Sequence, residues 1–196
     1  MNLETTSRDF FEQKYRGGAD PWNFASDPYE RNRYRAILNA INHRRYRRVF
    51  EPGCSVGELT ARLATICDHV EASDIAPSAV AQARERCYDL PNVRVTCAPV
   101  EALKLRGNYD LIAFCEIGYY FDELALHKLA RRLVGHLSDC GVLVAAHWLG
   151  ESEDHILSGD AVHRILRATS GIVLTSTERR PGFRLETWTK DRWVRQ

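Results

Sequence analysis

The chain has 196 residues, with 27 lysines and arginines against 26 aspartates and glutamates. This length suits a single domain with a sizeable core, and the net charge of +1 argues against a nucleic-acid or anionic-membrane partner. The N-terminus is polar and no run of about 18 apolar residues exists, so we expect a cytoplasmic protein without a membrane span. Six scattered cysteines, none in a Cys-x-x-Cys pair, predict reduced thiols.

Two helices are predicted at the start of the chain, over residues 5–15 and 28–43. The loop between them contains the sequence Asp20-Pro21-Trp22-Asn23-Phe24. We expect residues 1–46 to form a helical appendage, and residues 47–196 to form the core of one domain. Because ligands of open α/β sheets bind beyond the carboxyl ends of the strands, the appendage is expected to fold over such a site as a lid.

Short apolar runs alternate with helix-period segments in the rest of the chain. The helices are predicted from the glycine turn at 53–57, from Pro77, from Asp122 as an N-cap and over 160–169. The alternation predicts a doubly wound, mostly parallel α/β sheet, and the last two strands, with no helix between them, predict an antiparallel hairpin. The predicted strands are 47–51, 69–74, 93–97, 109–114, 141–146, 172–178 and 183–189.

The turn after the first strand contains Gly53 and Gly57 and leads directly into a helix. Glycine permits positive φ and lets a ligand approach the backbone closely. Ser55 and Glu58 match a capping box, which predicts that the helix begins within the turn. The Gly-x-x-x-Gly spacing fits neither the dinucleotide fingerprint nor a P-loop. Because the carboxylate of Glu51 would repel a pyrophosphate, the turn predicts a cofactor without phosphate.

Asp74 ends the second predicted strand, 21 residues after Gly53. A carboxylate at this place can accept hydrogen bonds from both ribose hydroxyls of an adenosine. The alternative is that Asp74 only caps the following helix. The glycine turn, the spacing and the strand end together favour ribose binding.

These residues resemble motifs I and II of the class I S-adenosylmethionine-dependent methyltransferases, over about residues 47–190. The resemblance implies a Rossmann-like seven-stranded sheet with a C-terminal antiparallel hairpin and an N-terminal helical lid. It implies S-adenosylmethionine as cofactor and S-adenosylhomocysteine as product. The residues expected at the cofactor are Trp22, Arg33, Glu51, Gly53, Cys54, Ser55, Gly57, Asp74, Ile75, Pro99, Val100 and Cys115.

The resemblance also implies roles for some of these residues. Glu51 lies near the amino group of the cofactor, and Asp74 holds its ribose. Pro99 stands where many family members have an aspartate, which leaves the backbone of Val100 as the contact to adenine. Arg33 is implied to reach the cofactor carboxylate, and a solvated charged helix face is the alternative for this arginine.

A narrower resemblance, over nearly the whole chain, is to the nodulation protein S (NodS) family of rhizobia. It depends on Asp20-Pro21-Trp22-Asn23-Phe24, on Tyr29-Glu30-Arg31-Asn32-Arg33-Tyr34 and on Ser158-Gly159-Asp160-Ala161-Val162-His163. It implies N-methylation of the free amine at the non-reducing end of a deacetylated chitooligosaccharide, during synthesis of nodulation signals.

The acceptor is expected beyond the fourth and fifth strands. An amine must be neutral to attack a methyl group, so a proton acceptor is needed nearby. Glu116 and His147 are the candidates for it, with a cofactor contact or helix cap as the alternative for Glu116 and a core position for His147. Tyr119 is a further catalytic candidate. Tyr120 and Trp148 are expected to bind the sugar, with plain aromatic packing as the alternative for both tyrosines.

Other functions remain open from the sequence. The acceptor could be another small amine, hydroxyl or thiol. A nicotinamide-dependent oxidoreductase is disfavoured by the glycine spacing and by Glu51, and a cofactor-binding scaffold is a non-enzymatic alternative. No metal site is expected, because the seven histidines lack a ligand spacing such as His-Glu-x-x-His.

Overall fold

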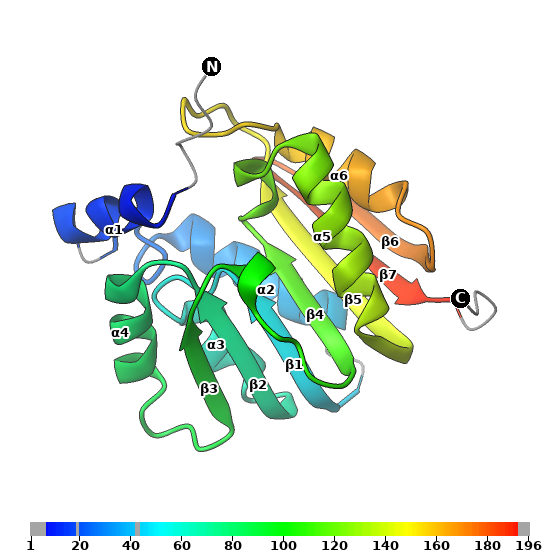
Figure 1. Ribbon diagram of the computed structural model, residues 1–196, viewed down its shortest axis with the longest axis horizontal. Coiled ribbons are helices and arrows are strands. Elements are labelled where there is room, and N and C mark those ends of the chain that lie inside the picture. Colours follow the sequence, from blue (N-terminus) through cyan, green and yellow to red (C-terminus); the bar gives the residue numbers. More distant parts are fainter. Residues whose placement is uncertain (1–6, 19, 42–43, 192–196) are drawn as a thin grey trace. The chain divides into compact units, whose positions relative to one another are not determined.

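The computed structural model describes residues 7–18, 20–41 and 44–191 (Figure 1). The chain divides into two units, Met1–Lys104 and Leu105–Gln196. The predicted boundary after residue 46 is a different division, and it stays a prediction. Within the described residues, no helix combines the length and the apolar character needed to cross a membrane.

The first unit contains three parallel strands, joined by helices. In the register of these strands Pro52 lies beside Ser73, and Asp74 lies beside Cys97, so the carboxyl ends of all three strands meet at one edge. The elements are α1 (Arg8–Gly17), α2 (Pro28–Ile41), β1 (Tyr46–Pro52), α3 (Glu58–Leu63), β2 (Cys67–Asp74), α4 (Pro77–Arg86), β3 (Val93–Cys97) and the 3-10 turn η2 (Val100–Ala102).

The second unit ends in the antiparallel hairpin that the sequence predicts. Cys115 lies beside Ala146 in the parallel pair β4·β5, and β7 runs antiparallel to both β5 and β6. The strand order is β3-β2-β1-β4-β5-β7-β6. The elements are β4 (Tyr109–Cys115), the 3-10 turn η3 (Gly118–Tyr120), α5 (Glu123–Gly135), β5 (Leu137–Trp148), α6 (Gly159–Arg167), β6 (Ile172–Arg180) and β7 (Phe183–Lys190).

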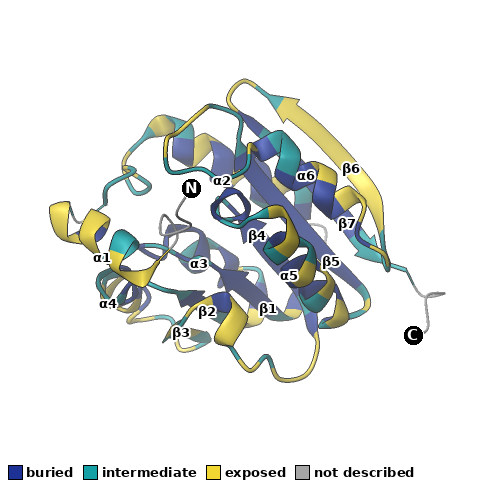
Figure 2. Cartoon of the chain, turned by 45° about the horizontal axis from the view of Figure 1, so that its top comes forward, coloured by how far each residue is buried: buried dark blue, intermediate teal, exposed yellow. Residues whose placement is uncertain are grey.

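Burial follows the apolar runs of the sequence (Figure 2). Residues 142–147 of β5 are all buried, as expected for a strand that is covered on both faces. The last strand of the order, β6, is exposed along almost its whole length, with Val173 53% and Leu174 38% exposed. The indole of Trp188 in β7 is 1% exposed and belongs to the core.

Two local predictions meet different outcomes. Asp122 caps α5 as expected, because its carboxylate accepts the Ala125 N–H at 2.7 Å. The capping box at the glycine turn is wrong. The N-cap of α3 is Gly57, which makes no side-chain cap, and the Glu58 carboxylate instead forms ion pairs with arginines. Because Arg62 of α3 and Arg86 of α4 bind the Glu58 carboxylate, it does not cap the helix.

Candidate active site

The glycine turn of the first unit is a series of residues with positive φ. Gly53 has φ 73°, Ser55 has φ 49° and Gly57 has φ 81°. A Cβ atom at Gly57 would lie 2.9 Å from the Ala83 Cα, so α4 packs directly against the turn. The N–H groups of Gly53 and Cys54 both donate to the Ser73 carbonyl, at 2.7 and 2.9 Å. The turn is therefore hydrogen-bonded to β2. Gly53 and Gly57 allow its positive φ angles, and Gly57 also allows the close approach of α4.

Asp74 is bound to the glycine turn through its carboxylate. Oδ2 accepts the Ser55 N–H at 2.9 Å, and Oδ1 accepts the Ala76 N–H at 3.0 Å. Burial raises the pKa of Asp74, while these backbone donors oppose the shift. The carboxylate is not the N-cap of α4, which is Ala76. Each carboxylate oxygen keeps a second lone pair that can accept a hydrogen bond from a ligand.

Glu51 lies at the end of β1 and is 3% exposed. Its Oε2 accepts a hydrogen bond from the Thr60 hydroxyl at 2.5 Å. Burial raises the pKa of Glu51 to about 8; the charge of Asp74 acts in the same direction, and the Thr60 hydrogen bond opposes it. The side chain is thus mainly neutral at pH 7, and a cation bound beside it would lower its pKa and favour the carboxylate.

The loops after β2 and β3 begin side by side at the carboxyl ends of these strands. The Ala98 N–H donates to the Asp74 carbonyl at 2.9 Å, which links the two loops. Ile75 is half-buried, Pro99 is exposed and Val100 is 7% exposed. Ile75, Pro99 and Val100, which are expected at the cofactor, therefore lie in two loops that are linked through Asp74.

The N-terminal helix α1 lies against the N-terminus of α4. The Glu12 carboxylate accepts the Ser78 N–H at 2.9 Å and the Ser78 hydroxyl at 2.6 Å. The Tyr15 hydroxyl donates to the Ser55 hydroxyl in the glycine turn at 2.5 Å. These contacts join α1 to the glycine turn and to α4, and the expected lid stays a prediction.

Trp22 and Arg33 belong to the same appendage. The Trp22 ring lies 5.4 Å from the Tyr15 ring, edge to face, and stacks on Phe24 at 5.6 Å. Arg33 is 2% exposed and forms an ion pair with Glu30. Burial excludes a solvated charged face for Arg33, so its guanidinium serves an internal contact.

Glu116 in the second unit joins the ends of β4 and β5. It has φ 57°, and its N–H donates to the Ala146 carbonyl at 3.0 Å. The carboxylate accepts the Trp148 N–H at 2.7 Å and the Tyr119 hydroxyl at 2.9 Å. Cys115, which precedes it, is 8% exposed. A carboxylate that is fixed by two donors in this way is preorganised for a further hydrogen bond.

Several aromatic rings pack around His155, next to the Tyr119 side chain that donates to this carboxylate. Tyr119 stacks on His155 at 3.7 Å with an interplanar angle of 17°, and Tyr120 and Trp148 lie edge to face with His155 at 5.3 and 6.0 Å. Burial lowers the pKa of His155. Its Nδ1 is enclosed and has no hydrogen-bond partner in the described part of the chain. No motif of the sequence indicates this position for His155, because only the fold of the loop after β5 brings the imidazole to Tyr119.

His147 is 0% exposed, unlike the other predicted acceptor residues. Its Nε2 accepts the Gly118 N–H at 3.1 Å, and its Nδ1 lies 3.2 Å from Nε2 of His163. Both ring nitrogens are thus engaged inside the protein. This geometry favours Glu116 over His147 as the group that contacts the acceptor.

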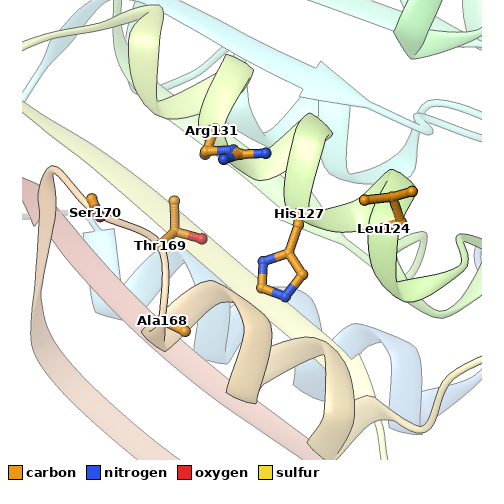
Figure 3. A pocket seen from close by; sticks show the side chains of 6 residues that line it. All are labelled: Leu124, His127, Arg131, Ala168, Thr169 and Ser170. Carbon is orange, nitrogen blue, oxygen red and sulfur yellow. The ribbon is translucent and has the colours of Figure 1, made fainter.

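A separate pocket lies between α5 and the C-terminal end of α6 (Figure 3). None of the predicted site residues lines it. It is formed by Leu124, His127, Arg131, Ala168, Thr169 and Ser170.

The strand order, the positive-φ glycine turn and the strand-end aspartate define a class I S-adenosylmethionine-dependent methyltransferase fold. Residues 5–169 match the family described as Nodulation protein S (NodS), and the chain belongs to this family. Nodulation protein S from Sinorhizobium fredii is 28% identical over 127 residues, which cover 64% of this chain and 59% of the relative. The matches to the first curated relatives cover 49–65% of the relatives' own lengths.

Solved structures show the same fold. A candidate methyltransferase from Pseudomonas syringae is 36% identical, with a TM-score of 0.74 over 83% of this chain and 99% of the other. N-methyltransferase NodS from Bradyrhizobium japonicum, in complex with S-adenosylhomocysteine, is 20% identical, with a TM-score of 0.82 over 95% and 98% of the two chains. Among methyltransferases with other acceptors, malonyl-[acyl-carrier protein] O-methyltransferase from Bacillus cereus is 32% identical over 99 residues.

Proposed function

We propose that this protein transfers a methyl group from S-adenosylmethionine to the free amine of the non-reducing-end glucosamine in a deacetylated chitooligosaccharide. The class of cofactor is supported by the first unit. Its glycine turn offers no lysine for a phosphate, while the carboxylates of Glu51 and Asp74 suit a cation and a pair of ribose hydroxyls. The acceptor is supported by the NodS family match over residues 5–169.

The observation that most supports amine chemistry is the fixed carboxylate of Glu116. When bound, S-adenosylmethionine would supply a methyl group on a sulfonium: the amine nitrogen would bond to the methyl carbon in line with the breaking C–S bond, and S-adenosylhomocysteine would leave. The attacking amine must lose a proton, and Glu116 is proposed to take it, directly or through one water. Trp148 and Tyr119 hold the carboxylate for this step. The aromatic rings of Tyr120 and Trp148 are proposed to contact the apolar C–H faces of the sugar.

The acceptor is tested by mass spectrometry. Purified protein is incubated with a methyl-deuterated cofactor and two chitooligosaccharides, one fully acetylated and one with a single free amine at the non-reducing end. We expect one deuterated methyl group only on the second oligosaccharide, with fragmentation placing it on the terminal nitrogen. Cofactor binding without methylation of any amino sugar would contradict the chitooligosaccharide proposal and favour another acceptor, such as that of the O-methyltransferase relative.

Cofactor binding is expected to release a proton through Glu51. In the free protein the pKa of this carboxyl is about 8, so at pH 7 it is mainly neutral. The cofactor ammonium group beside it favours the carboxylate, so binding should release close to one proton at pH 7. By linkage, the cofactor Kd should tighten as pH rises from about 6 towards 8, by up to about tenfold per unit, and then level off.

Calorimetry in buffers of different ionisation enthalpy measures this proton directly. The matched control is Glu51→Gln, which keeps an acceptor for the Thr60 hydroxyl but has no proton to lose. A wild-type binding enthalpy that does not depend on the buffer would remove Glu51 from the cofactor ammonium group.

A further inference from the structure

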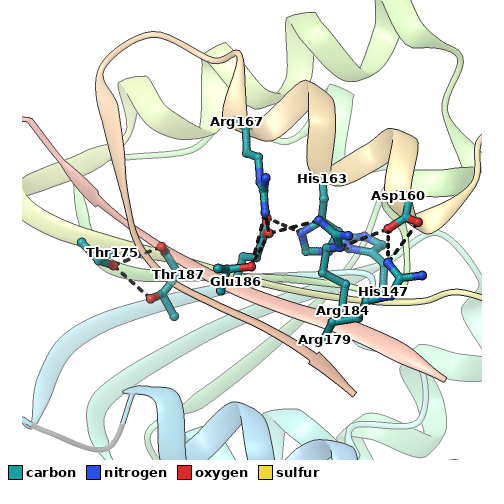
Figure 4. Close-up of polar contacts among 10 residues, drawn as sticks. His147, Asp160, His163, Arg167, Thr175, Arg179, Arg184, Glu186 and Thr187 are labelled. Atoms are coloured by element: carbon teal, nitrogen blue, oxygen red, sulfur yellow. Dashed lines mark hydrogen bonds and ion pairs between the residues drawn. The ribbon is translucent and has the colours of Figure 1, made fainter. Parts of the chain in front are cut away.

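A chain of hydrogen bonds crosses the interior of the second unit, from the 3-10 turn η3 to β7. Figure 4 shows three of its side chains, His147, His163 and Glu186. The Gly118 N–H donates to Nε2 of His147 at 3.1 Å. Nδ1 of His147 lies 3.2 Å from Nε2 of His163, and Nδ1 of His163 lies 2.8 Å from Oε2 of Glu186. All three side chains are 0% exposed. We call Glu186, His163 and His147 the histidine relay.

The Gly118 N–H, which donates to the histidine relay, determines where each proton of the two imidazoles lies. A backbone N–H can only donate, so Nε2 of His147 must carry a lone pair. Neutral His147 therefore has its proton on Nδ1 and donates it to Nε2 of His163. His163 in turn has its proton on Nδ1 and donates it to the Glu186 carboxylate. Both imidazoles are neutral, and for His163 burial also lowers the pKa.

Glu186 remains a carboxylate despite its burial. Burial alone would raise its pKa, but hydrogen bonds from His163 and Arg167 outweigh this effect and lower the pKa to about 2. Thr177 also donates to this carboxylate, at 2.8 Å. An ionised acceptor at this end fixes the tautomer of His163, because only the Nδ1–H form can donate to it.

At the other end of the relay, His147 contacts the turn Gly118–Tyr120. A Cβ atom at Gly118 would lie 2.4 Å from Cγ1 of Val162 and 2.8 Å from Nε2 of His147. The turn therefore packs directly against α6 and against the His147 imidazole. The next residue, Tyr119, donates its hydroxyl to Glu116. If His147 were the Nε2–H tautomer, two N–H groups would face each other and push the turn away.

We propose that Glu186 and His163 are positioning residues for methyl transfer: they hold His147 in the Nδ1–H tautomer, so that the Gly118–Tyr120 turn places Tyr119 against the Glu116 carboxylate. The inference rests on the proposed role of Glu116 as proton acceptor. It requires no residue of the relay to touch the acceptor. It assigns a function to buried polar groups that cofactor binding does not use.

The first test measures the tautomers in the intact wild-type protein, without cofactor or acceptor. Nitrogen-15 NMR correlations within the imidazole rings distinguish the two neutral forms. We expect His147 and His163 both as Nδ1–H, with a coupling across the hydrogen bond between the Gly118 nitrogen and Nε2 of His147. An Nε2–H tautomer of His147 would overturn the proposal, whatever the acceptor of the enzyme is.

A pair of variants of similar size tests the positioning role. In His163→Gln the side chain can still accept from Nδ1 of His147 and donate to Glu186, whereas in His163→Met it can do neither. We expect the methionine variant to exchange the Gly118 amide hydrogen at least about tenfold faster than the glutamine variant, the equivalent of one hydrogen bond. We expect kcat to fall in the same order, with the cofactor Kd unchanged in both variants.

A purely structural role predicts the opposite order of exchange rates, because burying an apolar side chain costs less free energy than burying an amide. Equal or better protection of Gly118 in the methionine variant would therefore overturn the proposal. The charge is tested by Glu186→Gln, which should give mixed tautomers of His147. Its control is Glu178→Gln, the same change at an exposed position on β6, where the Glu178 carboxylate pairs with Arg180 at 2.7 Å. Absence of methyl transfer in the wild type would end the proposed function and leave the NMR results to decide the relay.

Discussion

Replacing Glu116 by glutamine is expected to lower kcat for methyl transfer by roughly 10²–10⁴-fold, with the cofactor Kd nearly unchanged. The amide cannot accept the proton that the amine must lose. It can still maintain the local structure, because its oxygen accepts the Trp148 N–H and its NH₂ group can donate to the Tyr119 oxygen. The variant therefore removes the proton acceptor and leaves the loop in place.

Steady-state kinetics and calorimetry on the same preparation separate the two effects. The control is Glu123→Gln, the same chemical change at an exposed position in the first turn of α5. A parallel loss of turnover and cofactor affinity in Glu116→Gln would assign this carboxylate to the cofactor instead. If kcat remained unchanged, the proton would have to leave by another route.

Replacing Asp74 by asparagine is expected to weaken cofactor binding by roughly 1–3 kcal/mol, which is about a 5- to 150-fold increase in Kd. The carboxylate is expected to accept hydrogen bonds from the ribose while it also accepts the N–H groups of Ser55 and Ala76. An asparagine side chain has one acceptor oxygen, so its NH₂ group must face one of these donors. The glycine turn should therefore lose stability as well.

Calorimetry with S-adenosylhomocysteine and thermal unfolding of the free protein measure these two losses separately. Asp68→Asn serves as the control: Asp68 lies at the opposite end of β2, where its carboxylate pairs with Arg45 at 2.6 Å. If Asp74→Asn lowered the unfolding temperature and left the Kd unaltered, Asp74 would be a structural residue of the turn only.

Local patterns were sufficient to predict most of the elements. The apolar runs and the glycine turn predict strands and helices in the right order, and the absence of a helix between the last two strands predicts the hairpin β6–β7. The helix after the glycine turn shows where local patterns fail. Leu59, Leu63, Ile66 and Val70 recur at helical spacing, but α3 ends at Leu63 and β2 begins at Cys67. Pairing with β1 determines where that strand starts.

Motifs that are continuous in sequence also predicted which residues meet at the strand ends of the first unit. Glu51, the glycine turn and Asp74 lie on adjacent strand ends, as the alternation of strands and helices requires. The enclosure of Arg33 and the hydrogen bonds of Glu116 do not follow from any spacing, because each depends on side chains from other elements.

The sequence by itself determined the class of fold, the glycine turn and the strand-end carboxylates, because these depend on backbone conformation and on the period of apolar residues. Only the tertiary structure decided which polar side chains meet. His147 lies 16 residues from His163, and His163 lies 23 residues from Glu186, yet their atoms are within hydrogen-bond distance. Such contacts form when strands pair and helices pack over them, and no local pattern encodes that packing.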